Sequence, residues 1–273
     1  MGEYPLTVEN LSVSFKDQTS TAAVRNIDFK LRPGSVFGII GESGAGKSSL
    51  ALALMGLQDK RRAETSGKVR FRGKNLLDLS EAELCRLRGS GIGMIFQDPM
   101  GALDPSMKVV DQLAEVIRLH EEVSRKESRR LAIEQLGTVG IKEDILITAP
   151  YAFQLSGGLC QRAMIAMALA ADPEVLIADE PTSSLDLRLQ SQIIRLLNER
   201  RGSSGLSIVF ISHDLALVSA FADDLMVLHE GEAVETGKCS EILTHPGHAY
   251  TKSLVRMWKK SAGLEEDIAV APA

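Results

Sequence analysis

Hydrophobic and polar positions follow a short period in the first part of the chain. Up to about residue 71, brief apolar stretches separated by turn residues predict strands. One helix is expected among them, from Lys47 to Leu57, because this stretch has no helix breaker before Gly56. The predicted strands are Leu6–Val8, Leu11–Phe15, Ile27–Leu31, Val36–Ile40 and Val69–Phe71.

Between Ser80 and Ala149 the pattern changes to a helical period. The stretches EAELCRLRG, VVDQLAEVIRLHEEV and SRKESRRLAIEQLGTVGI each predict a helix. The charged run HEEVSRKESRR mixes both signs, which favours a solvated helical face over a binding patch. In the second helix the expected apolar face consists of Val109, Val110, Leu113, Val116 and Ile117.

After Pro173, strands and helices alternate. The apolar stretches VLIAD (Val175–Asp179) and SIVFIS (Ser207–Ser212) predict buried strands, and RLQSQIIRLLNER and LALVSAFA predict helices. DLMVLHEG and AVETG predict a hairpin that turns at Glu230-Gly231. This alternation indicates a mostly parallel sheet covered on both faces, and residues 261–273 are expected to form a flexible tail.

Composition and charge narrow the classes of function. With 273 residues the chain can bury a full core, and its net charge of −5 and 4% aromatic content argue against a nucleic-acid partner. The three scattered cysteines are typical of a reducing compartment and do not predict a metal cluster. No signal peptide is expected, and the apolar run Ala163–Ala171 is far shorter than the ~20 residues of a membrane-spanning helix.

The segment GESGAGKSS has the form G-x-x-x-x-G-K-[ST] of a phosphate-binding loop. It stands between a predicted strand and a predicted helix, the context that this motif requires, which disfavours an incidental glycine-rich turn. Backbone N–H groups of such a loop surround phosphates, the lysine supplies a cation and the next serine is an oxygen ligand for Mg²⁺. The residues expected to contact ATP are Gly41, Ser43, Gly44, Gly46, Lys47, Ser48 and Ser49.

Polar residues follow three further strand-like segments. Asp179 and Glu180 end the apolar run VLIADEP, at the strand end where parallel sheets bind ligands. We expect Asp179 to hold Mg²⁺ and Glu180 to polarise the attacking water. His213 follows SIVFIS and Gln97 follows GIGMIF, so both are candidates at the same edge, Gln97 as a ligand of the metal or of water; a lone histidine, however, is more often structural.

A second candidate phosphate contact lies in QLSGGLCQR. Ser156 is expected to cap a helix that begins with Gly157 and Gly158, and exposed N–H groups at such a terminus attract phosphate. A helix that begins here runs towards the start of the strand that ends at Asp179, so its N-terminus is expected to lie far from the first loop. The economical interpretation is that it contacts the ATP of a second molecule.

Taken in order, these motifs resemble those of ATP-binding cassette (ABC) ATPases. The motifs in this series are GESGAGKSS, Gln97, LSGG, IADEP, Ser184-Leu185-Asp186 and His213, and the resemblance extends from about Leu6 to Val255. The resemblance implies an α/β fold, with a P-loop NTPase (RecA-like) core, an N-terminal antiparallel β subdomain and an inserted α-helical subdomain. It implies one ABC ATPase domain over 1–260, with 1–97 and 165–260 forming the core and β subdomain and 98–164 the helical subdomain.

The same resemblance implies partners and roles. Two ABC ATPase subunits, identical or paralogous, would form a head-to-tail dimer that encloses ATP and Mg²⁺. Glu180 would be the catalytic base, His213 the γ-phosphate switch and Gln97 the link to a transmembrane permease. Phe15 would stack on adenine, where tyrosine is usual, with a core phenylalanine as the alternative. The chain would lie on the cytoplasmic face of the membrane, served indirectly by an extracytoplasmic substrate-binding protein.

Two phrases, MIFQDPMGALDP and HPGHAYTKSL, are similar to those of the peptide/nickel importer branch. Many peptide-type members carry a cysteine cluster near the C-terminal end, where this chain has only Cys239, and this difference inclines the resemblance towards nickel or metallophore subunits. His245 and His248 are expected in a solvated loop. Two alternatives are a mechanical ATPase of the DNA-repair or chromosome type and a regulatory ATP-binding subunit. Mechanical ATPases have a long coiled coil between the phosphate loop and the LSGG motif, and the 109 positions between Lys47 and Ser156 (156 − 47) contain no sustained heptads, which disfavours the first alternative. The intact Glu180 and His213 disfavour the second.

Overall fold

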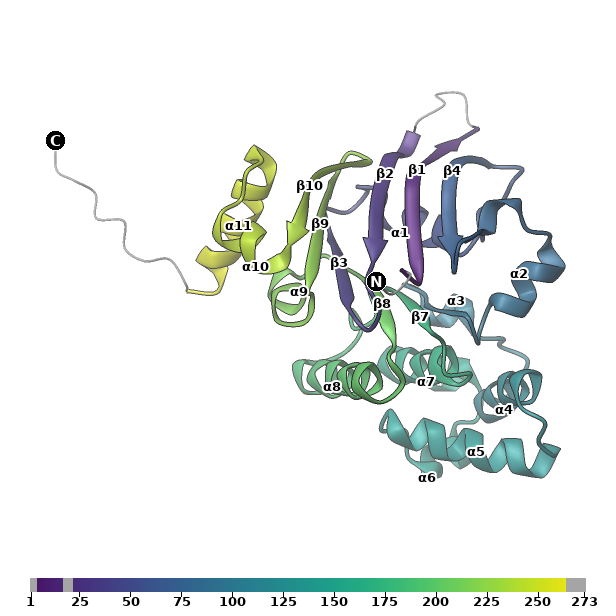
Figure 1. Cartoon of the computed structure of the whole chain (residues 1–273). Coiled ribbons are helices and arrows are strands. Elements are labelled where there is room, and N and C mark those ends of the chain that lie inside the picture. Colours follow the sequence, from purple (N-terminus) through teal and green to yellow (C-terminus); the bar gives the residue numbers. More distant parts are fainter. Residues whose placement is uncertain (1–3, 17–21, 264–273) are drawn as a thin grey trace, which may run out of the picture.

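Two sheets organise residues 4–16 and 22–263, which this computed structural model describes (Figure 1). The smaller sheet is antiparallel, with the strand order β2-β1-β4-β5. It lies at the upper right of Figure 1 and forms the predicted β subdomain. Its strands are β1 (Leu6–Phe15), β2 (Ala22–Leu31), β4 (Ala63–Phe71) and β5 (Lys74–Asn75).

The larger sheet has the strand order β10-β9-β3-β8-β7-β6 and is parallel except for β10. The strands β3, β6, β7 and β8 are buried along their whole length, as their continuous apolar sequences require when helices cover both faces. This arrangement confirms the predicted α/β fold. The strands are β3 (Val36–Ile40), β6 (Ile92–Ile95), β7 (Val175–Asp179), β8 (Ser207–Ser212), β9 (Asp224–His229) and β10 (Glu232–Lys238).

Helices cover the larger sheet and also lie beyond it at two ends. In Figure 1, α7 and α8 lie below the sheet, α4 to α6 form a group beside α7, and α10 and α11 lie at the opposite end. The helices are α1 (Lys47–Leu54), α2 (Glu81–Leu87), α3 (Pro99–Ala102), α4 (Val109–His120), α5 (Arg125–Thr138), α6 (Glu143–Thr148), α7 (Gly157–Leu169), α8 (Leu187–Ser204), α9 (Leu215–Phe221), α10 (Cys239–Thr244) and α11 (Ala249–Ser261), with 3₁₀ turns η1 (Leu76–Asp78) and η2 (Ala152–Gln154).

The core forms two hydrophobic clusters, one on each face of the larger sheet. Successive residues of β8 alternate between them: Ile208 and Phe210 pack with α4, α5, α7 and α8, and Val209 and Ile211 pack with α1 and the antiparallel sheet. Burial of apolar area, worth about 25 cal/mol per Å², therefore holds three layers together. The predicted apolar face of α4 is confirmed, since four of its five residues are buried and Val116 packs against the same cluster.

Several predicted elements differ from those observed. β1 is one strand rather than two, because Asn10 takes a left-handed φ of 49° and its N–H bonds to Asp28, so the chain continues past an irregular pairing. Helix α1 ends at Leu54, since Gly56 has a φ of 61°. No helix was predicted at the positions of α6, α10 and α11. α11 reaches Ser261, within the expected tail, and residues 264–273 of that tail lie outside the described residues.

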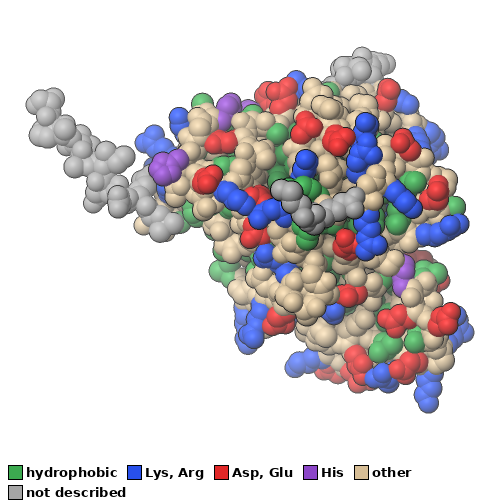
Figure 2. All heavy atoms as spheres, in the orientation of Figure 1, with side chains coloured by type: hydrophobic (Ala, Val, Ile, Leu, Met, Phe, Trp, Pro, Cys, Tyr) green, Lys and Arg blue, Asp and Glu red, His purple; other side chains and the backbone are tan. Residues whose placement is uncertain are grey.

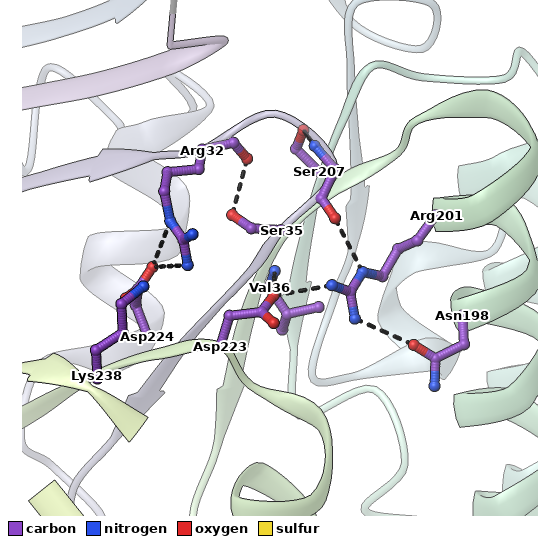
Figure 3. Close-up of polar contacts among 10 residues, drawn as sticks. Arg32, Ser35, Val36, Asn198, Arg201, Ser207, Asp223, Asp224 and Lys238 are labelled. Carbon is purple, nitrogen blue, oxygen red and sulfur yellow. Dashed lines mark hydrogen bonds and ion pairs between the residues drawn. The ribbon is translucent and has the colours of Figure 1, made fainter. Parts of the chain in front are cut away.

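A polar network joins elements at the edge of the larger sheet where β3 and β9 begin (Figure 3). Arg201, near the end of α8, donates to Asp223, which also accepts the backbone N–H of Val36. Beside it, Arg32 and Lys238 both pair with Asp224. These contacts anchor the amino ends of two strands and leave their carboxyl ends for the site.

The surface charges are mixed. In Figure 2 acidic and basic side chains intermingle over the group α4 to α6, in agreement with the predicted solvated face. Among the described residues, no helix combines the length and apolar character that crossing a membrane requires.

Candidate active site

The phosphate loop connects β3 to α1. Gly46, the residue before the helix, has a φ of 101°, and a Cβ there would lie 2.1 Å from the carbonyl oxygen of Ala23, so this position requires glycine. The Lys47 ammonium donates to the carbonyl oxygens of Gly41 (2.8 Å) and Glu42 (2.9 Å). Burial lowers the pKa of Lys47, while the negative charges of nearby carboxylates oppose that shift. The loop thus presents a cation at the start of a helix, where anions bind.

Oxygen atoms from three elements converge beside Lys47. Asp179, at the end of β7, is 3% exposed, and its Oδ1 has no hydrogen-bond partner among the described residues. Burial raises the pKa of Asp179, and a hydrogen bond from Ser48 opposes the rise. The Ser48 Oγ also lies 3.2 Å from Gln97 Oε1. An orphaned carboxylate oxygen beside a hydroxyl and an amide oxygen fits Mg²⁺, which prefers oxygen ligands.

The next residue, Glu180, forms a pair with His213. His213 Nδ1 lies 2.8 Å from both carboxylate oxygens of Glu180. Glu180 is only 6% exposed and has a left-handed φ of 51°, a strained conformation that a hydrogen bond from its N–H to Ile211 O (3.0 Å) helps to hold. The histidine therefore orients a buried carboxylate whose backbone is itself fixed by the neighbouring strand β8.

These groups border one cleft of about 540 Å³. Phe15 lines the cleft with 37% of its surface exposed, so it does not belong to the core. Asp179 and Gly41 do not line the cleft themselves: the carbonyl oxygen of Gly41 accepts the Lys47 ammonium, and Asp179 lies beside Ser48. The cleft is lined by Phe15, Ala23, Ser43, Gly44, Gly46, Lys47, Ser48, Ser49, Gln97, Glu180 and His213.

The LSGG residues do not line that cleft. The Ser156 Oγ accepts the N–H of Leu159, so this serine caps α7 as predicted. A Cβ on Gly157 would meet no atom within 4 Å, whereas one on Gly158 would contact the carbonyl oxygen of Ser184 at 3.2 Å. The N-terminus of α7 is therefore open on the side of Ser156 and Gly157.

Two residues of this region had no predicted role. Ala23 of β2 lines the cleft, and no property of an alanine indicates such a position. Gln161 is fully buried in α7 and donates to the carbonyl oxygen of Pro181 (2.9 Å), which connects the LSGG helix to the segment after Glu180. A glutamine at the start of the apolar stretch of this helix, beside Arg162, was the available signal for that contact.

Known proteins are similar to this chain in both sequence and fold. Residues 24–183 match the family described as ABC transporter. The chain belongs to this family. The ABC ATPase is 45% identical over 255 residues to the dipeptide transport ATP-binding protein DppD of Lactococcus lactis subsp. cremoris (strain MG1363), an alignment that covers 93% of this chain and 73% of that protein. It is 44% identical over 261 residues to the glutathione import ATP-binding protein GsiA of Shigella flexneri serotype 5b (strain 8401), covering 92% of this chain and 41% of that protein.

A solved structure supports the same assignment. The ATP-binding cassette MJ0796, a dimer in a post-hydrolysis state bound to ADP and Pi, superimposes on the ABC ATPase with a TM-score of 0.78. The two are 27% identical, and the match covers 86% of this chain and 98% of that one. The chain is thus an ATPase coupled to transport, and ATP is its nucleotide.

Proposed function

We propose that this chain is the ATP-hydrolysing subunit of an importer for short peptides. The observation that carries the proposal is the cleft itself. Its groups follow the carboxyl ends of three adjacent parallel strands and meet at one edge of the sheet. Lys47 follows β3, Asp179 ends β7 with Glu180 next to it, and His213 follows β8. This set combines phosphate binding, metal binding and water activation, which is what phosphoryl transfer to water requires.

In the proposed reaction each group has one task. The loop N–H groups and Lys47 hold the triphosphate, and Ser48, Gln97 and Asp179 hold Mg²⁺, which would neutralise phosphate charge when bound. Glu180 accepts hydrogen-bond donation from the attacking water and takes its proton. His213 orients that carboxylate and, from its exposed position on the cleft, contacts the γ-phosphate.

We further propose that two ATPase subunits, identical or paralogous, close the cleft head to tail. Ser156, Gly157 and Gly158 do not line the chain's own cleft, and the open space at Gly157 leaves room for phosphate oxygens to approach the backbone. The N–H groups at the start of the 13-residue helix α7 would bind the γ-phosphate held by the partner's loop.

We propose that the permease partner contacts the surface of the helical subdomain, 98–164. Met100, Ile147 and Phe153 are large apolar side chains exposed there, and Gln97 in the cleft lies two residues before α3. A coupling helix of a transmembrane permease would cover these residues and sense the nucleotide through Gln97. The chain would then be peripheral, on the cytoplasmic face of the membrane, and an extracytoplasmic substrate-binding protein would deliver cargo to the permease.

The cargo class rests on the relatives. DppD is named for dipeptide transport and GsiA for import of glutathione, a tripeptide. We therefore propose a short peptide, and place nickel or a metallophore second. Relatives that are named for transport and import disfavour the rival functions, a mechanical ATPase of the DNA-repair type and a regulatory ATP-binding subunit, and an intact Glu180–His213 pair at 2.8 Å favours an active enzyme.

The decisive variant is Glu180→Gln, which keeps the shape of the side chain and removes its basicity. Loss of a general base lowers turnover by about 10²- to 10⁴-fold. We expect phosphate release from MgATP to fall by that factor while binding of MgATP persists. Size-exclusion chromatography should then detect a dimer in MgATP that dissociates into monomers in ADP.

Two controls accompany this experiment. Glu199→Gln makes the same chemical change on the exposed face of α8 and should leave turnover unchanged. Lys47→Ala should instead weaken MgATP binding itself. Normal turnover in Glu180→Gln would refute the base assignment, and a Glu180→Gln chain that stays monomeric in MgATP, alone and with its companion subunit, would refute the shared site.

A further inference from the structure

The helix α7 carries a buried polar side chain, that of Gln161. It is fully buried, and its Nε2 donates to the carbonyl oxygen of Pro181 (2.9 Å). A carbonyl oxygen only accepts hydrogen bonds, so this contact fixes which end of the amide faces Pro181. The Oε1 atom is also buried and has no hydrogen-bond partner among the described residues.

A glutamine at this position is unfavourable if stability is its only role. A buried polar atom without a partner opposes folding, and such atoms are rare in native proteins. Methionine has nearly the same length and volume and would leave no polar atom of its own unpaired. What methionine lacks is the donor to Pro181, so the function of Gln161 is to be sought at that contact.

Pro181 begins the turn that directly follows Glu180. The carbonyl oxygen of Glu180 accepts both the N–H (3.3 Å) and the Oγ hydroxyl (3.1 Å) of Ser183, so the turn folds back onto the residue that carries the base. Glu180 itself has a left-handed φ of 51°, and a strained backbone of this kind persists only when its surroundings hold it. Gln161 holds the peptide unit between Pro181 and Thr182, which is the next one along the chain.

The start of α7 approaches the same turn closely. A Cβ on Gly158 would lie 3.2 Å from the carbonyl oxygen of Ser184 and 3.4 Å from the side chain of Leu185. Gly158 and Gln161 are three positions apart and therefore lie on one face of the helix. A Cβ on Gly157, by contrast, would meet no atom within 4 Å. One helix thus contacts the turn after the base and also has an open N-terminus.

We propose that Gln161 is a positioning residue for hydrolysis: its amide holds the turn after Glu180 to α7, so that this helix, when its N-terminus binds the partner's ATP, sets the position of the base in its own cleft. The proposal rests on the head-to-tail dimer proposed above. Gln161 is fully buried and does not line the cleft, so it acts on the rate of hydrolysis and not on the affinity for MgATP.

The first test is Gln161→Met, measured on the assembly that dimerises in MgATP, the chain alone or with its companion subunit. Loss of one hydrogen bond changes a rate about three- to tenfold, so kcat for phosphate release should fall by that factor. The KM for MgATP should stay unchanged, because the groups that bind the nucleotide are intact. Gln192→Met makes the same change on the exposed face of α8 and should alter neither constant.

The melting temperature of Gln161→Met separates positioning from packing. The variant removes the unpaired Oε1 but leaves the Pro181 carbonyl oxygen without its donor, and these two effects oppose each other. The melting temperature should therefore change by less than about 3 °C although kcat falls. A purely structural glutamine would give the opposite result, a lower melting temperature and an unchanged kcat in the folded protein.

A double-mutant cycle tests the link to the N-terminus of α7. Ser156→Ala removes the hydroxyl at the start of this helix and should lower kcat by itself. In a chain that already carries Ser156→Ala, Gln161→Met should lower kcat by a smaller factor than it does alone. The reason is that a helix with a weakened contact to the partner's phosphate has less to transmit to the base.

An unchanged kcat in Gln161→Met would overturn the positioning role, and independent effects of Gln161→Met and Ser156→Ala would overturn the link. If Gln161→Met does not fold, Gln161→Leu removes the same donor and is judged by the same criteria. Failure of the underlying function has a different signature: Glu180→Gln would then retain turnover or stay monomeric in MgATP, whatever the result for Gln161→Met.

Discussion

Removal of the Arg201 guanidinium offers a quantitative test of how the sheet is anchored. The side chain is 22% exposed and makes three contacts: Nε donates to Gly34 O at 3.1 Å, Nη2 to Asp223 Oδ2 at 2.8 Å and Nη1 to Asn198 Oδ1 at 3.2 Å. Figure 3 shows the contacts with Asp223 and Asn198. Arg201→Met keeps most of the apolar stem and removes all three. The end of α8 then loses its connection to the start of β3.

The expected cost follows from these contacts. A hydrogen bond that involves a charged group contributes about 1.5–3 kcal/mol, but partial exposure reduces such a pair towards ~1 kcal/mol. Counting the Asp223 contact at ~1 kcal/mol and the other two together at about the same, the free energy of unfolding should fall by roughly 2 kcal/mol. For a chain of this size that corresponds to a melting temperature lower by about 4–8 °C.

Arg195→Met is the matched control. Arg195 lies on the same helix and, within residues 4–16 and 22–263, pairs only with Glu199 at 3.0 Å, with 82% of its side chain exposed. An exposed i,i+4 pair contributes about 0.3–0.5 kcal/mol, so the melting temperature should change by less than ~2 °C.

Urea unfolding followed by circular dichroism gives the free energies, and differential scanning fluorimetry gives the melting temperatures. The Kd of MgATP should be unchanged in both variants, because the network lies at the edge of the sheet away from the cleft. Equal destabilisation by Arg201→Met and Arg195→Met would refute the reasoning, since burial and the number of contacts would then have no influence.

Two further predictions concern a buried thiol and a tightly packed glycine. Burial raises the pKa of Cys239 to about 11, so its proton stabilises the folded state fully below the unfolded value of ~8.5, and this contribution is lost as pH rises towards 11. At pH 8 a disulfide reagent should therefore label exposed Cys85 quickly and Cys239 only after denaturation; rapid labelling of two thiols would contradict this burial. Gly41→Ala places a Cβ 2.2 Å from the Leu228 carbonyl oxygen and should weaken MgATP binding more than tenfold, which is about 1.4 kcal/mol. Gly202→Ala, with open space around it in α8, should leave the Kd unchanged, and a similar Kd in both variants would contradict the close packing.

The local parts of the site were predictable because their chemistry lies in contiguous residues. Gly41 to Ser49 is a complete loop between a strand and a helix, and the run that ends in Asp179 and Glu180 is a buried strand with its acids at one end. Continuous apolar sequence indicates a strand buried on both faces, so β3, β7 and β8 were found with their observed ends.

Short or weakly patterned elements were not predictable. α11 follows a segment rich in histidine, proline and glycine, which does not indicate a helix start, and Glu235, a residue of another element, accepts the N–H groups of the two residues just before the helix. Two adjacent strands seen in the pattern of β1 became one, because Asp28 of the next strand satisfies the irregular backbone at Asn10.

By itself, the sequence determined the phosphate loop between β3 and α1 and the pair of acids at the end of β7, because a loop motif and the end of an apolar strand need only neighbouring residues. Tertiary structure alone decided that the carboxylate of Glu180 meets His213, that Ala23 borders the cleft and that the N–H of Gly231 donates to the carbonyl oxygen of Ala45. The two hydrogen bonds join residues 33 and 186 positions apart (213 − 180 and 231 − 45). The order of strands in a sheet and the seating of helices on it set such distances, and both depend on how hydrophobic faces pack together rather than on any local period.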